Sequence, residues 1–495
     1  MSELQIETET LIEQIRQGPS GPEIAAVFDF DGTLIDGFSA AALYEHRLRS
    51  FEIGPDELVR TVRAALGPTL SEAQFTELIE SGIQGWAGRT EDDLLELGER
   101  LFAQGVAGNL FHQAWRLVKA HQKQGHTVLI ATSATELQVA PLARELGVEH
   151  VLCTRLATEG GVLTGAVEGR PPWGDGKVAA VEGFAEEHGL DLAFSHGYAN
   201  GDEDLPLLEA VGHPHPVNPS DELAAIAAER GWPVLRFRRV PDRFDPRPAI
   251  RTAAMYGTLL GTAGAGILAG ALNNDRRLGV DLATTLFGNL AGVIGNIDFE
   301  IIGEENAWAA RPAVFFINHQ STLIEYLVTS RVIRSGFTVV AKAEVKQMPV
   351  IGQLFSMAGV AFLDRANREK AIEALRPAVE KLRSGTSVVM APEGTRSLTP
   401  KLGRFKKGGF HMAVQAGVPI VPVVIRNAGE IMWRGAKTAR TGTIQVVVHP
   451  PVPTAGWTIA DIDRARDEMQ RLYQDTLDDW PGTAGATGTV AAVTR

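Results

Sequence analysis

The chain has 495 residues, of which 44% are hydrophobic and 22% are charged, a globular composition that excludes a largely disordered protein. One hydrophobic core rarely extends over such a length, so we expect two domains. The formal net charge of −13 argues against a nucleic-acid partner, because a nucleic-acid backbone is also negative. Cys153 is the one cysteine, which excludes an internal disulfide, and the acidic first residues lack the apolar core of a secretory signal. We therefore expect the polar domains to face the cytoplasm.

Strand-like and helical stretches alternate in two separate series, which predicts two α/β domains. A helix at residues 1–22 precedes the first domain, which spans residues 23–245. The second domain spans residues 299–480, and a flexible tail follows at residues 481–495. The segment between the domains, residues 246–298, has a different composition.

This intervening segment is predicted to form a helical hairpin. Two stretches without charge, residues 252–274 and 282–297, flank the short charged segment DRRLGVD. Glycines repeat with the same spacing in both stretches, so we expect each set to lie on one helical face and to let the helices pack closely. These glycines are Gly257, Gly261 and Gly264 in the first stretch and Gly288, Gly292 and Gly295 in the second.

The two stretches differ in length. The first is long enough to cross a bilayer, whereas the second is shorter than the roughly 20 residues that a crossing helix needs. A monotopic or re-entrant hairpin on the cytoplasmic face of the cell membrane, in contact with membrane lipids, is therefore favoured. The alternative is a pair of helices buried in the core of the second domain.

In the first domain, the stretch VFDFDGTLI ends a buried strand with two carboxylates, Asp29 and Asp31. Carboxylates two residues apart at a strand end point the same way, so one can attack a substrate or bind a cation while the other transfers a proton. A later strand ends at Thr132, and the segment GDGK contributes Lys177.

These motifs, in this order, resemble the haloacid dehalogenase superfamily and in particular its phosphoserine phosphatase-like branch. The resemblance implies an N-terminal Rossmann-like domain with a helical cap at about residues 37–120. It also implies a phosphatase with Asp29 as nucleophile and Asp31 as acid/base, in which Thr132 and Lys177 contact the phosphoryl group.

The Mg²⁺ site implied by this resemblance departs from the usual pattern. Asn200 stands where relatives have an aspartate ligand, so the implied ligands are Asp29, Asp31, Asn200 and Asp204. Asparagine is neutral and a weaker ligand than carboxylate for a hard cation. Either Asp202 or Asp204 substitutes for the missing carboxylate, or Mg²⁺ binds less tightly. A domain kept for scaffolding or for binding a phosphorylated ligand is the alternative.

The second domain carries a separate constellation around His319, which follows the apolar strand VFFI and precedes Glu325 by six residues. A neutral imidazole can take a proton from an alcohol when a carboxylate orients its other nitrogen. Further polar blocks follow the predicted strands of this domain, and they contain Arg365, Glu393, Gly394 and Arg396.

This succession of blocks resembles the glycerolphosphate and lysophosphatidate acyltransferase family. The resemblance implies an α/β acyltransferase domain that makes phosphatidate from lysophosphatidate and an acyl thioester of coenzyme A or acyl carrier protein. His319 is then the base, and Glu393 and Gly394 belong to the acceptor-binding block. Cations available for the acceptor's phosphate are Arg365 and Arg396, with Lys342, Lys346, Arg404, Lys406 and Lys407 nearby in sequence. Most of the lysines fit a solvated basic face, and arginine is the better bidentate partner, so the two arginines are preferred.

The acid that follows the histidine also departs from its family. The usual aspartate stands five positions after the histidine, where this chain has Ile324, and Glu325 comes next. One helical residue rotates a side chain by about 100°, so Glu325 can replace the aspartate only if its extra methylene and a local bulge return the carboxylate to His319. Otherwise a backbone carbonyl or another acid orients the imidazole.

The sequence thus predicts a haloacid dehalogenase-like domain fused to a membrane-associated acyltransferase domain. The main alternative is a Mg²⁺-dependent phosphatase acting on a small or lipid phosphate, with the C-terminal domain as a lipid-binding module. A non-catalytic membrane scaffold is a third interpretation, if the departures at Asn200 and Glu325 are disabling.

Overall fold

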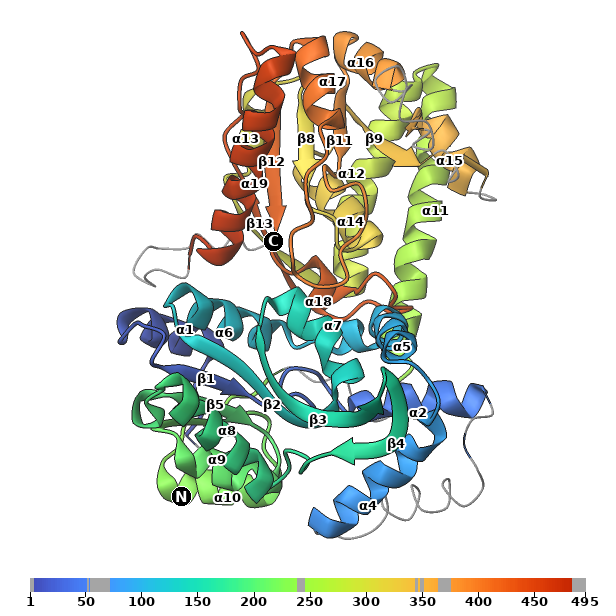
Figure 1. Cartoon of the computed structure of the whole chain (residues 1–495). Coiled ribbons are helices and arrows are strands. Elements are labelled where there is room, and N and C mark those ends of the chain that lie inside the picture. Colours follow the sequence, from blue (N-terminus) through green and yellow to red (C-terminus); the bar gives the residue numbers. More distant parts are fainter. Residues whose placement is uncertain are drawn as a thin grey trace. The chain divides into compact units, whose positions relative to one another are not determined.

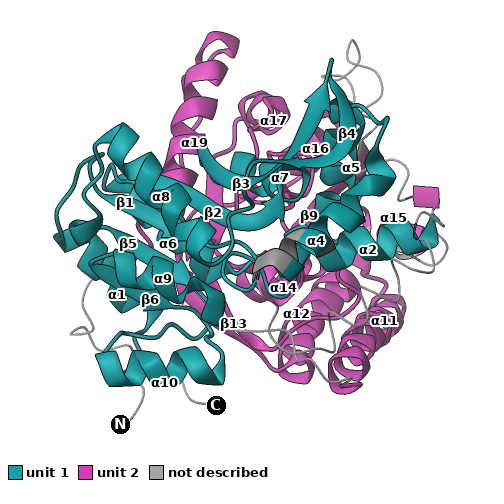
Figure 2. Ribbon diagram, turned by 60° about the horizontal axis from the view of Figure 1, so that its bottom comes forward, with its two compact units in different colours: residues 1–242 teal, residues 243–495 magenta. Residues whose placement is uncertain are grey.

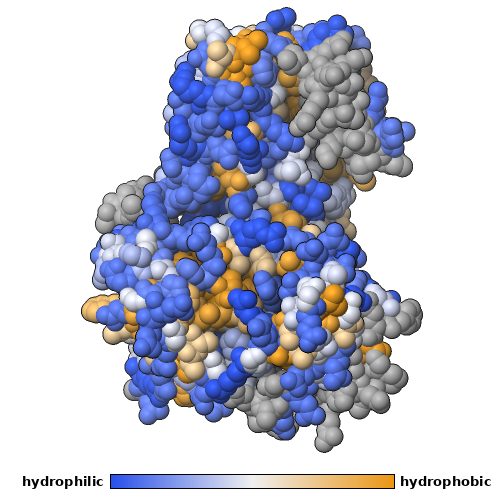
Figure 3. Space-filling model, in the orientation of Figure 1, coloured by the Kyte–Doolittle hydropathy of each residue, from blue (hydrophilic) through white to orange (hydrophobic). Residues whose placement is uncertain are grey.

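The computed structural model (Figure 1) describes residues 4–50, 53, 72–237, 245–342, 346–347, 351–363 and 375–482. The chain divides into two compact units, residues 1–242 and 243–495 (Figure 2). Each unit has its own sheet, helices and buried core, so the predicted α/β fold class is confirmed. Hydrophilic residues cover most of the surface visible in Figure 3, as the charged fraction of 22% leads one to expect.

The first unit is built on one six-stranded sheet. Its elements in chain order are α1 (Thr8–Gln17), β1 (Ala25–Phe28), α2 (Ser39–Arg49), α4 (Glu72–Ile83), α5 (Glu91–Gln104), α6 (His112–Lys123), β2 (Thr127–Thr135), α7 (Glu136–Leu146), β3 (His150–Glu159), β4 (Val162–Glu168), α8 (Asp175–His188), β5 (His196–Ala199), α9 (Leu205–Ala210), β6 (His213–Pro216) and α10 (Asp221–Arg230). The strand order is β4-β3-β2-β1-β5-β6, and only the pair β3 and β4 is antiparallel. The central strand β1 is buried along its whole length, as expected for a parallel strand covered on both faces.

Parallel strands bring their carboxyl ends to one edge of a sheet, where α/β proteins place their sites. β1 ends directly before Asp29, β2 contains Thr132 in its second half, and β5 ends directly before Asn200. Because β2, β1 and β5 are neighbours, these three polar residues meet at the same edge.

The second unit contains a seven-stranded sheet with the strand order β10-β9-β11-β8-β12-β13-β7. Its elements are α11 (Arg247–Asn273), α12 (Arg276–Gly295), β7 (Ile297–Ile302), α13 (Asn306–Ala309), β8 (Val314–Ile317), α14 (Thr322–Val332), β9 (Phe337–Lys342), α15 (Ile351–Ala358), β10 (Ala361–Leu363), α16 (Arg376–Arg383), β11 (Ser387–Met390), α17 (Gly408–Ala416), β12 (Ile420–Ile425), α18 (Ala428–Ile431), β13 (Gly442–Val448) and α19 (Ile462–Asp478). The pairs are parallel except for β12 and β13. β8 is the central strand and is fully buried, so the residues that follow its carboxyl end lie at the middle of the sheet edge.

The predicted hairpin is present as α11 and α12, but its turn lies elsewhere. The two helices contain 27 and 20 residues, and only Asn274 and Asp275 separate them. Asn274 takes the left-handed conformation, and the carboxylate of Asp275 accepts the backbone N–H groups of Arg277 and Leu278. This cap begins α12 inside the segment that was predicted to be the turn. Both helices are therefore long and apolar enough to cross a membrane, by length and composition alone.

The two helices approach most closely at Gly266 and Gly279. A Cβ atom added at Gly266 would lie 2.4 Å from the carbonyl oxygen of Gly279, and one added at Gly279 would lie 2.3 Å from that of Gly266. The prediction for the glycine set of α11 was wrong, because among the described residues a Cβ at Gly257, Gly261 or Gly264 meets nothing within 4 Å. In α12, Gly288 packs against the backbone of α14 at Ser330. α12 thus lies between α11 and the body of the unit.

Candidate active sites

His319 follows β8 and meets Glu325 from the first turn of α14. Nδ1 of His319 lies 2.6 Å from Oε2 of Glu325. The other carboxylate oxygen accepts the backbone N–H groups of Gln320 at 2.5 Å and Ser321 at 2.7 Å. The carboxylate is nearly buried, whereas 24% of the His319 side chain is exposed. The imidazole is therefore fixed at one nitrogen and accessible to solvent.

The length of the glutamate side chain explains how the acid can stand one position later than the usual aspartate. α14 is α-helical from Thr322 onward, so the expected local bulge is not part of this helix. Glu325 lies in the first turn, and its carboxylate folds back onto backbone N–H groups that precede the helix, much as a capping box does. These bonds, together with the extra methylene, hold the carboxylate against His319.

The contact with Glu325 also sets the tautomer of His319. A carboxylate only accepts hydrogen bonds, so the hydrogen of the neutral imidazole lies on Nδ1 and the lone pair on Nε2. Among the described residues, Nε2 has no hydrogen-bond partner. This nitrogen can accept a proton from the hydroxyl group of a substrate that reaches the exposed part of the ring.

Glu393 binds the backbone of the loop that contains His319. One of its carboxylate oxygens accepts the backbone N–H of His319 at 2.6 Å, and the other accepts the N–H of Gly403 at 2.7 Å and the hydroxyl of Ser397 at 3.1 Å. Burial raises the pKa of Glu393 to about 7, although these hydrogen bonds lower it. Three loop groups thus donate hydrogen bonds to this carboxylate. Sequence reasoning missed these bonds because no local motif indicates them.

Gly394 has a positive φ of 75°, and a Cβ atom there would lie 3.0 Å from Nζ of Lys406. Lys406 therefore lies against the same loop, although sequence reasoning did not prefer it. Arg396, which was preferred, instead donates to the carbonyl oxygen of Arg434 at 3.3 Å.

Lys342 and Arg365 were also named from the sequence as possible phosphate contacts. Lys342 is the last residue of β9, which is separated from β8 by β11. Arg365 lies outside the described residues. The structure therefore brings together His319, Glu325, Glu393 and Gly394, and leaves the contribution of Arg365 as a prediction.

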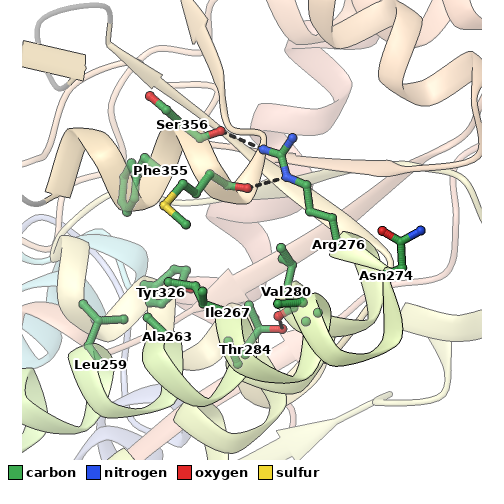
Figure 4. Close-up of a pocket in the computed structure, with 16 residues that line it drawn as sticks. Leu259, Ala263, Ile267, Asn274, Arg276, Val280, Thr284, Tyr326, Phe355 and Ser356 are labelled. Carbon is green, nitrogen blue, oxygen red and sulfur yellow. Dashed lines mark hydrogen bonds between the residues drawn. The ribbon is translucent and has the colours of Figure 1, made fainter.

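An apolar cavity of about 680 Å³ lies between the hairpin, α14 and α15 (Figure 4). Leu259, Ala263 and Ile267 of α11 form one side, and Phe355 lies across from them. Tyr326, the residue after Glu325, also lines the cavity, so one turn of α14 contributes to both the histidine site and this cavity. Further lining residues are Gly266, Gly270, Ala271, Asn274, Arg276, Gly279, Val280, Ala283, Thr284, Ser356 and Met357.

A second candidate site lies in the first unit, in a cavity of about 690 Å³ at the carboxyl edge of the sheet. Lys177 bridges two buried carboxylates there, with Nζ 2.8 Å from Asp29 and 2.5 Å from Asp204. Burial raises the pKa of Asp29 to about 7, although Lys177 lowers it. Burial opposes the charge of Lys177, but Asp204 and Asp29 raise its pKa above the ordinary value. Thr132 lines the same cavity, as predicted from its place in β2.

Asp31, Asn200 and Asp202, which also line this cavity, are held by protein groups. Asp31 accepts the backbone N–H of Ser39 at 2.6 Å, and burial raises its pKa to about 6 although Ser39 lowers it. Asn200 accepts the hydroxyl of Thr33 at 3.2 Å. One carboxylate oxygen of Asp202 caps α10 by accepting from Ser220 and from the N–H of Leu223. Asp204 is bound by Lys177, and the substitution of Asp202 or Asp204 for the missing carboxylate stays a prediction.

Comparison with known proteins supports both sites. A family model described as haloacid dehalogenase-like hydrolase matches residues 26–209, and one described as acyltransferase matches residues 298–426. The chain is 35% identical over 184 residues to the 1-acyl-sn-glycerol-3-phosphate acyltransferase of Saccharomyces cerevisiae, a match that covers 37% of this chain and 60% of the yeast enzyme. It is 33% identical over 203 residues to an uncharacterized acyltransferase of Schizosaccharomyces pombe, covering 40% of this chain and 72% of that protein.

A third relative has the name of a phosphatase. The chain is 39% identical over 149 residues to a probable phosphatase of Mycobacterium tuberculosis, a match that covers 30% of this chain and 52% of that protein. Two different classes of enzyme thus match one chain, in agreement with its two units. The chain belongs to the acyltransferase family through its second unit, and its first unit is a haloacid dehalogenase-like hydrolase domain.

Proposed function

We propose that the second unit transfers a fatty acyl group from a thioester to the free hydroxyl of 1-acylglycerol 3-phosphate, which yields phosphatidate and a free thiol. The observation that carries this proposal is the contact of 2.6 Å between Nδ1 of His319 and the carboxylate of Glu325, which leaves Nε2 as the base. The matching acyltransferase model and the name of the yeast relative support the substrate class.

In the proposed reaction, Nε2 of His319 removes the proton of the acceptor hydroxyl while the hydroxyl oxygen attacks the thioester carbonyl carbon. The C–S bond then breaks, the new ester C–O bond remains, and the imidazolium returns its proton to the leaving thiolate. Glu325 stays ionised and stabilises the imidazolium, as the aspartate does in a catalytic triad. Glu393 keeps the backbone of His319 in place. Coenzyme A or acyl carrier protein carries the acyl group.

The apolar cavity beside α14 is the place that we propose for an acyl chain. Its lining on α11 runs from Leu259 to Ala271, thirteen residues or about 18 Å along the helix axis. Tyr326 connects this cavity to the turn that carries Glu325. We assign the cavity to one of the two fatty chains of the reaction, because apolar walls with few polar groups are typical of lipid sites.

The exposed apolar surface of the hairpin supports membrane association. More than half of the exposed large hydrophobic residues in the described part of the chain lie on α11 and α12, and the most exposed of these are Ile250 at 65%, Leu272 at 77% and Val293 at 80%. Only 22% of an apolar 18-residue segment of α11 is buried, whereas a core helix would be mostly buried.

The contacts at the tip of the hairpin support a monotopic arrangement. Arg276 donates to the carbonyl oxygens of Met357 at 2.6 Å and Ser356 at 2.8 Å, which ties the tip to α15 of the same unit (Figure 4). A hairpin whose tip is bound to its own domain lies along the membrane surface more readily than across it.

The direct test is acyl transfer by the purified chain from radiolabelled oleoyl-coenzyme A to lysophosphatidate, followed by separation of the lipids. We expect labelled phosphatidate, its loss in His319→Ala, and its retention in Asp29→Ala. If neither oleoyl-coenzyme A nor an acylated carrier protein gives labelled phosphatidate, the proposal is wrong.

A second activity is proposed for the first unit, because Asp29, Asp31 and Lys177 line one cavity in a haloacid dehalogenase-like domain. Lys177 pairs with Asp29 and Asp204, and the carboxylate of Asp31 lines the same cavity, so a divalent cation would balance the remaining negative charge. The oxygen donors of Asp29, Asp31 and Asn200 fit Mg²⁺, which prefers oxygen ligands and would neutralise a bound phosphate.

In this second reaction, Asp29 would attack the phosphorus atom and Asp31 would protonate the leaving oxygen. Asp31 would then take a proton from the water that hydrolyses the aspartyl phosphate, which releases phosphate and restores Asp29. A panel of phosphate esters, assayed with and without Mg²⁺, tests it. Phosphate release that is lost in Asp29→Ala and kept in His319→Ala is the expected result. Release that survives Asp29→Ala would overturn this assignment.

A further inference from the structure

The acceptor of the proposed reaction carries a phosphate monoester, so the site needs a cation near His319. Several cations occur in the loop between β11 and α17, but their side chains have different surroundings. The cations named from the sequence in this loop are Arg396, Arg404, Lys406 and Lys407.

Two of these cations are engaged elsewhere. Nζ of Lys407 lies 2.8 Å from the carboxylate of Asp463 at the start of α19. Arg396 donates to the backbone carbonyl of Arg434, and Arg434 donates in return to the carbonyl of Arg396 at 2.9 Å. This reciprocal pair directs the guanidinium of Arg396 toward the loop after α18.

Arg404 lies within electrostatic range of the acidic residue at the start of α19. The hydrogen bond and charge of Lys407 lower the pKa of Asp463 most, and the charges of Arg466 and then Arg404 lower it further. Arg404 and Lys407 therefore share one acidic neighbour, which reduces the positive potential that either offers to a bound anion.

Lys406 differs from these cations. Its aliphatic chain and its Nζ lie over Gly394, where an added Cβ would be 3.0 Å from Nζ and 3.1 Å from Cδ. No carboxylate or carbonyl oxygen of the described residues accepts from this amine. The backbone N–H of Lys406 donates to the carbonyl of Pro392 at 2.8 Å, so the start of its side chain is fixed.

The position over Gly394 brings the amine of Lys406 next to the histidine loop. Gly394 follows Glu393, whose carboxylate accepts the backbone N–H of His319 at 2.6 Å. The same carboxylate accepts the N–H of Gly403, so the loop from Gly403 to Lys406 wraps around it. The requirement for glycine at residue 394 is explained by the same geometry, because φ is +75° and a side chain would displace the lysine.

We propose that Lys406 binds the phosphate of the acceptor and thereby selects acceptors that carry a phosphate monoester. This inference rests on the proposed acyl transfer and adds a specificity-determining residue to it. Lys406 contributes a point charge on a flexible chain, which suits a phosphate group that must approach and leave.

The test compares Lys406→Met with Lys407→Met, a matched change at the next residue whose amine is bound to Asp463. Acylation of lysophosphatidate and of monoacylglycerol, which keeps the acceptor hydroxyl and has a second hydroxyl in place of the phosphate, is measured for each. In Lys406→Met the KM for lysophosphatidate should rise roughly 10- to 100-fold with little change in kcat, because a charged hydrogen bond formed in both the ground and the transition state is lost. The preference for lysophosphatidate over monoacylglycerol should fall by the same factor.

Two further measurements keep the inference separate from the proposed function. Lys406→Arg should recover most of the affinity, since it restores the charge, and Lys407→Met should keep the wild-type KM. If the wild type acylates lysophosphatidate while Lys406→Met keeps its KM and its preference, Lys406 does not bind the phosphate and only this inference is overturned. If the wild type acylates no phosphate-bearing acceptor, the proposed function fails and this inference fails with it.

Discussion

Glu393 and His319, 74 residues apart in the chain, are joined by a hydrogen bond of 2.6 Å from the histidine backbone N–H to the glutamate carboxylate. The second oxygen of that carboxylate holds Gly403 and Ser397. One buried acid therefore ties the backbone of the proposed base to the loop that contains Ser397 and Gly403, and its own contact with the acceptor is not needed to explain its place in the site.

The variant Glu393→Gln tests this positioning role. An amide has one oxygen acceptor, so either His319 or Gly403 would face an NH₂ group and lose its partner. We expect kcat to fall roughly 100-fold, because a displacement of about 1 Å at a catalytic group has such an effect. The KM values should change little. Ser397→Ala removes one weaker donor and should have a much smaller effect, and equal losses in both variants would contradict the argument.

The pair of Glu325 and His319 gives a second prediction. Glu325→Gln keeps the shape of the side chain but no longer stabilises the imidazolium, so kcat should fall roughly 10²- to 10⁴-fold. Glu325→Asp should lose activity as well, since the shorter chain cannot span the distance that the carboxylate now covers. Steady-state acyl transfer measures both variants.

A compensating double variant serves as the control for this pair. Ile324→Asp combined with Glu325→Ile puts an aspartate at the position that relatives use, and part of the lost rate should return. Wild-type kcat in Glu325→Gln would show that another group orients His319.

The strand ends of this protein could be predicted from sequence because their signals are local. The apolar runs before Asp29 and before His319 are followed directly by the polar residues that reach the sheet edge. Hydrogen bonds between residues far apart in the chain could not be predicted in this way. Nothing near Glu393 indicates that its carboxylate binds the backbone of His319.

The hairpin shows the same limit. Glycine spacing indicated close packing of two helices, but three of the glycines in α11 have open space where a side chain would be. The contact is made by Gly266 and Gly279, whose pairing depends on the position of the turn at Asn274. That turn is set by the cap at Asp275, a residue that composition alone assigned to a longer charged segment.

The neutral side chain of Asn200 gives a prediction for the first unit. Asn200→Asp adds a carboxylate to the edge that holds Asp29 and Asp31. We expect the Mg²⁺ concentration for half-maximal phosphatase activity to fall at least 10-fold, since Mg²⁺ prefers anionic oxygen ligands. Mg²⁺ titration of p-nitrophenyl phosphate hydrolysis measures it. Asp202→Asn, at a carboxylate that caps α10, should leave the Mg²⁺ requirement unchanged, and a similar shift in both variants would contradict the role of Asn200.

A group of buried histidines at the amino-terminal edge of the first sheet predicts acid sensitivity. Burial lowers the pKa of His196 to about 2, with a further contribution from His215, and burial lowers the pKa of His215 to about 3. In the unfolded chain a histidine takes up a proton near pH 6.5. Below that pH the unfolded state therefore binds more protons than the folded state, so the free energy of unfolding decreases as the pH falls from 6.5 toward 3.

The expected slope is about 1.4 kcal/mol per pH unit for each of these histidines. Hydrogen exchange of amides in β5 and β6, corrected for intrinsic rates, gives the free energy of opening at pH 7.5 and pH 5.5. His196→Gln should lose less stability than the wild type between these values. An opening free energy that is the same at both pH values in the wild type would refute this origin of acid sensitivity.

The exposed side chains of the hairpin give the last prediction. Leu268 and Leu272 lie one helical turn apart on α11, with 61% and 77% of their surfaces exposed. Placing a charge in the hydrocarbon region costs about 2.5 to 3.5 kcal/mol per residue, so Leu268→Glu with Leu272→Glu should shift most of the protein from vesicles to solution in a flotation assay. Ile459→Glu is the matched control, because Ile459 is 73% exposed in the same unit but outside the hairpin, and it should float like the wild type. Acylation of a water-soluble short-chain acceptor should persist in the double variant, since His319 and Glu325 are unchanged. If the double variant floats as the wild type does, these leucines do not enter the bilayer, and the lipid must reach the cavity beside α14 by another surface.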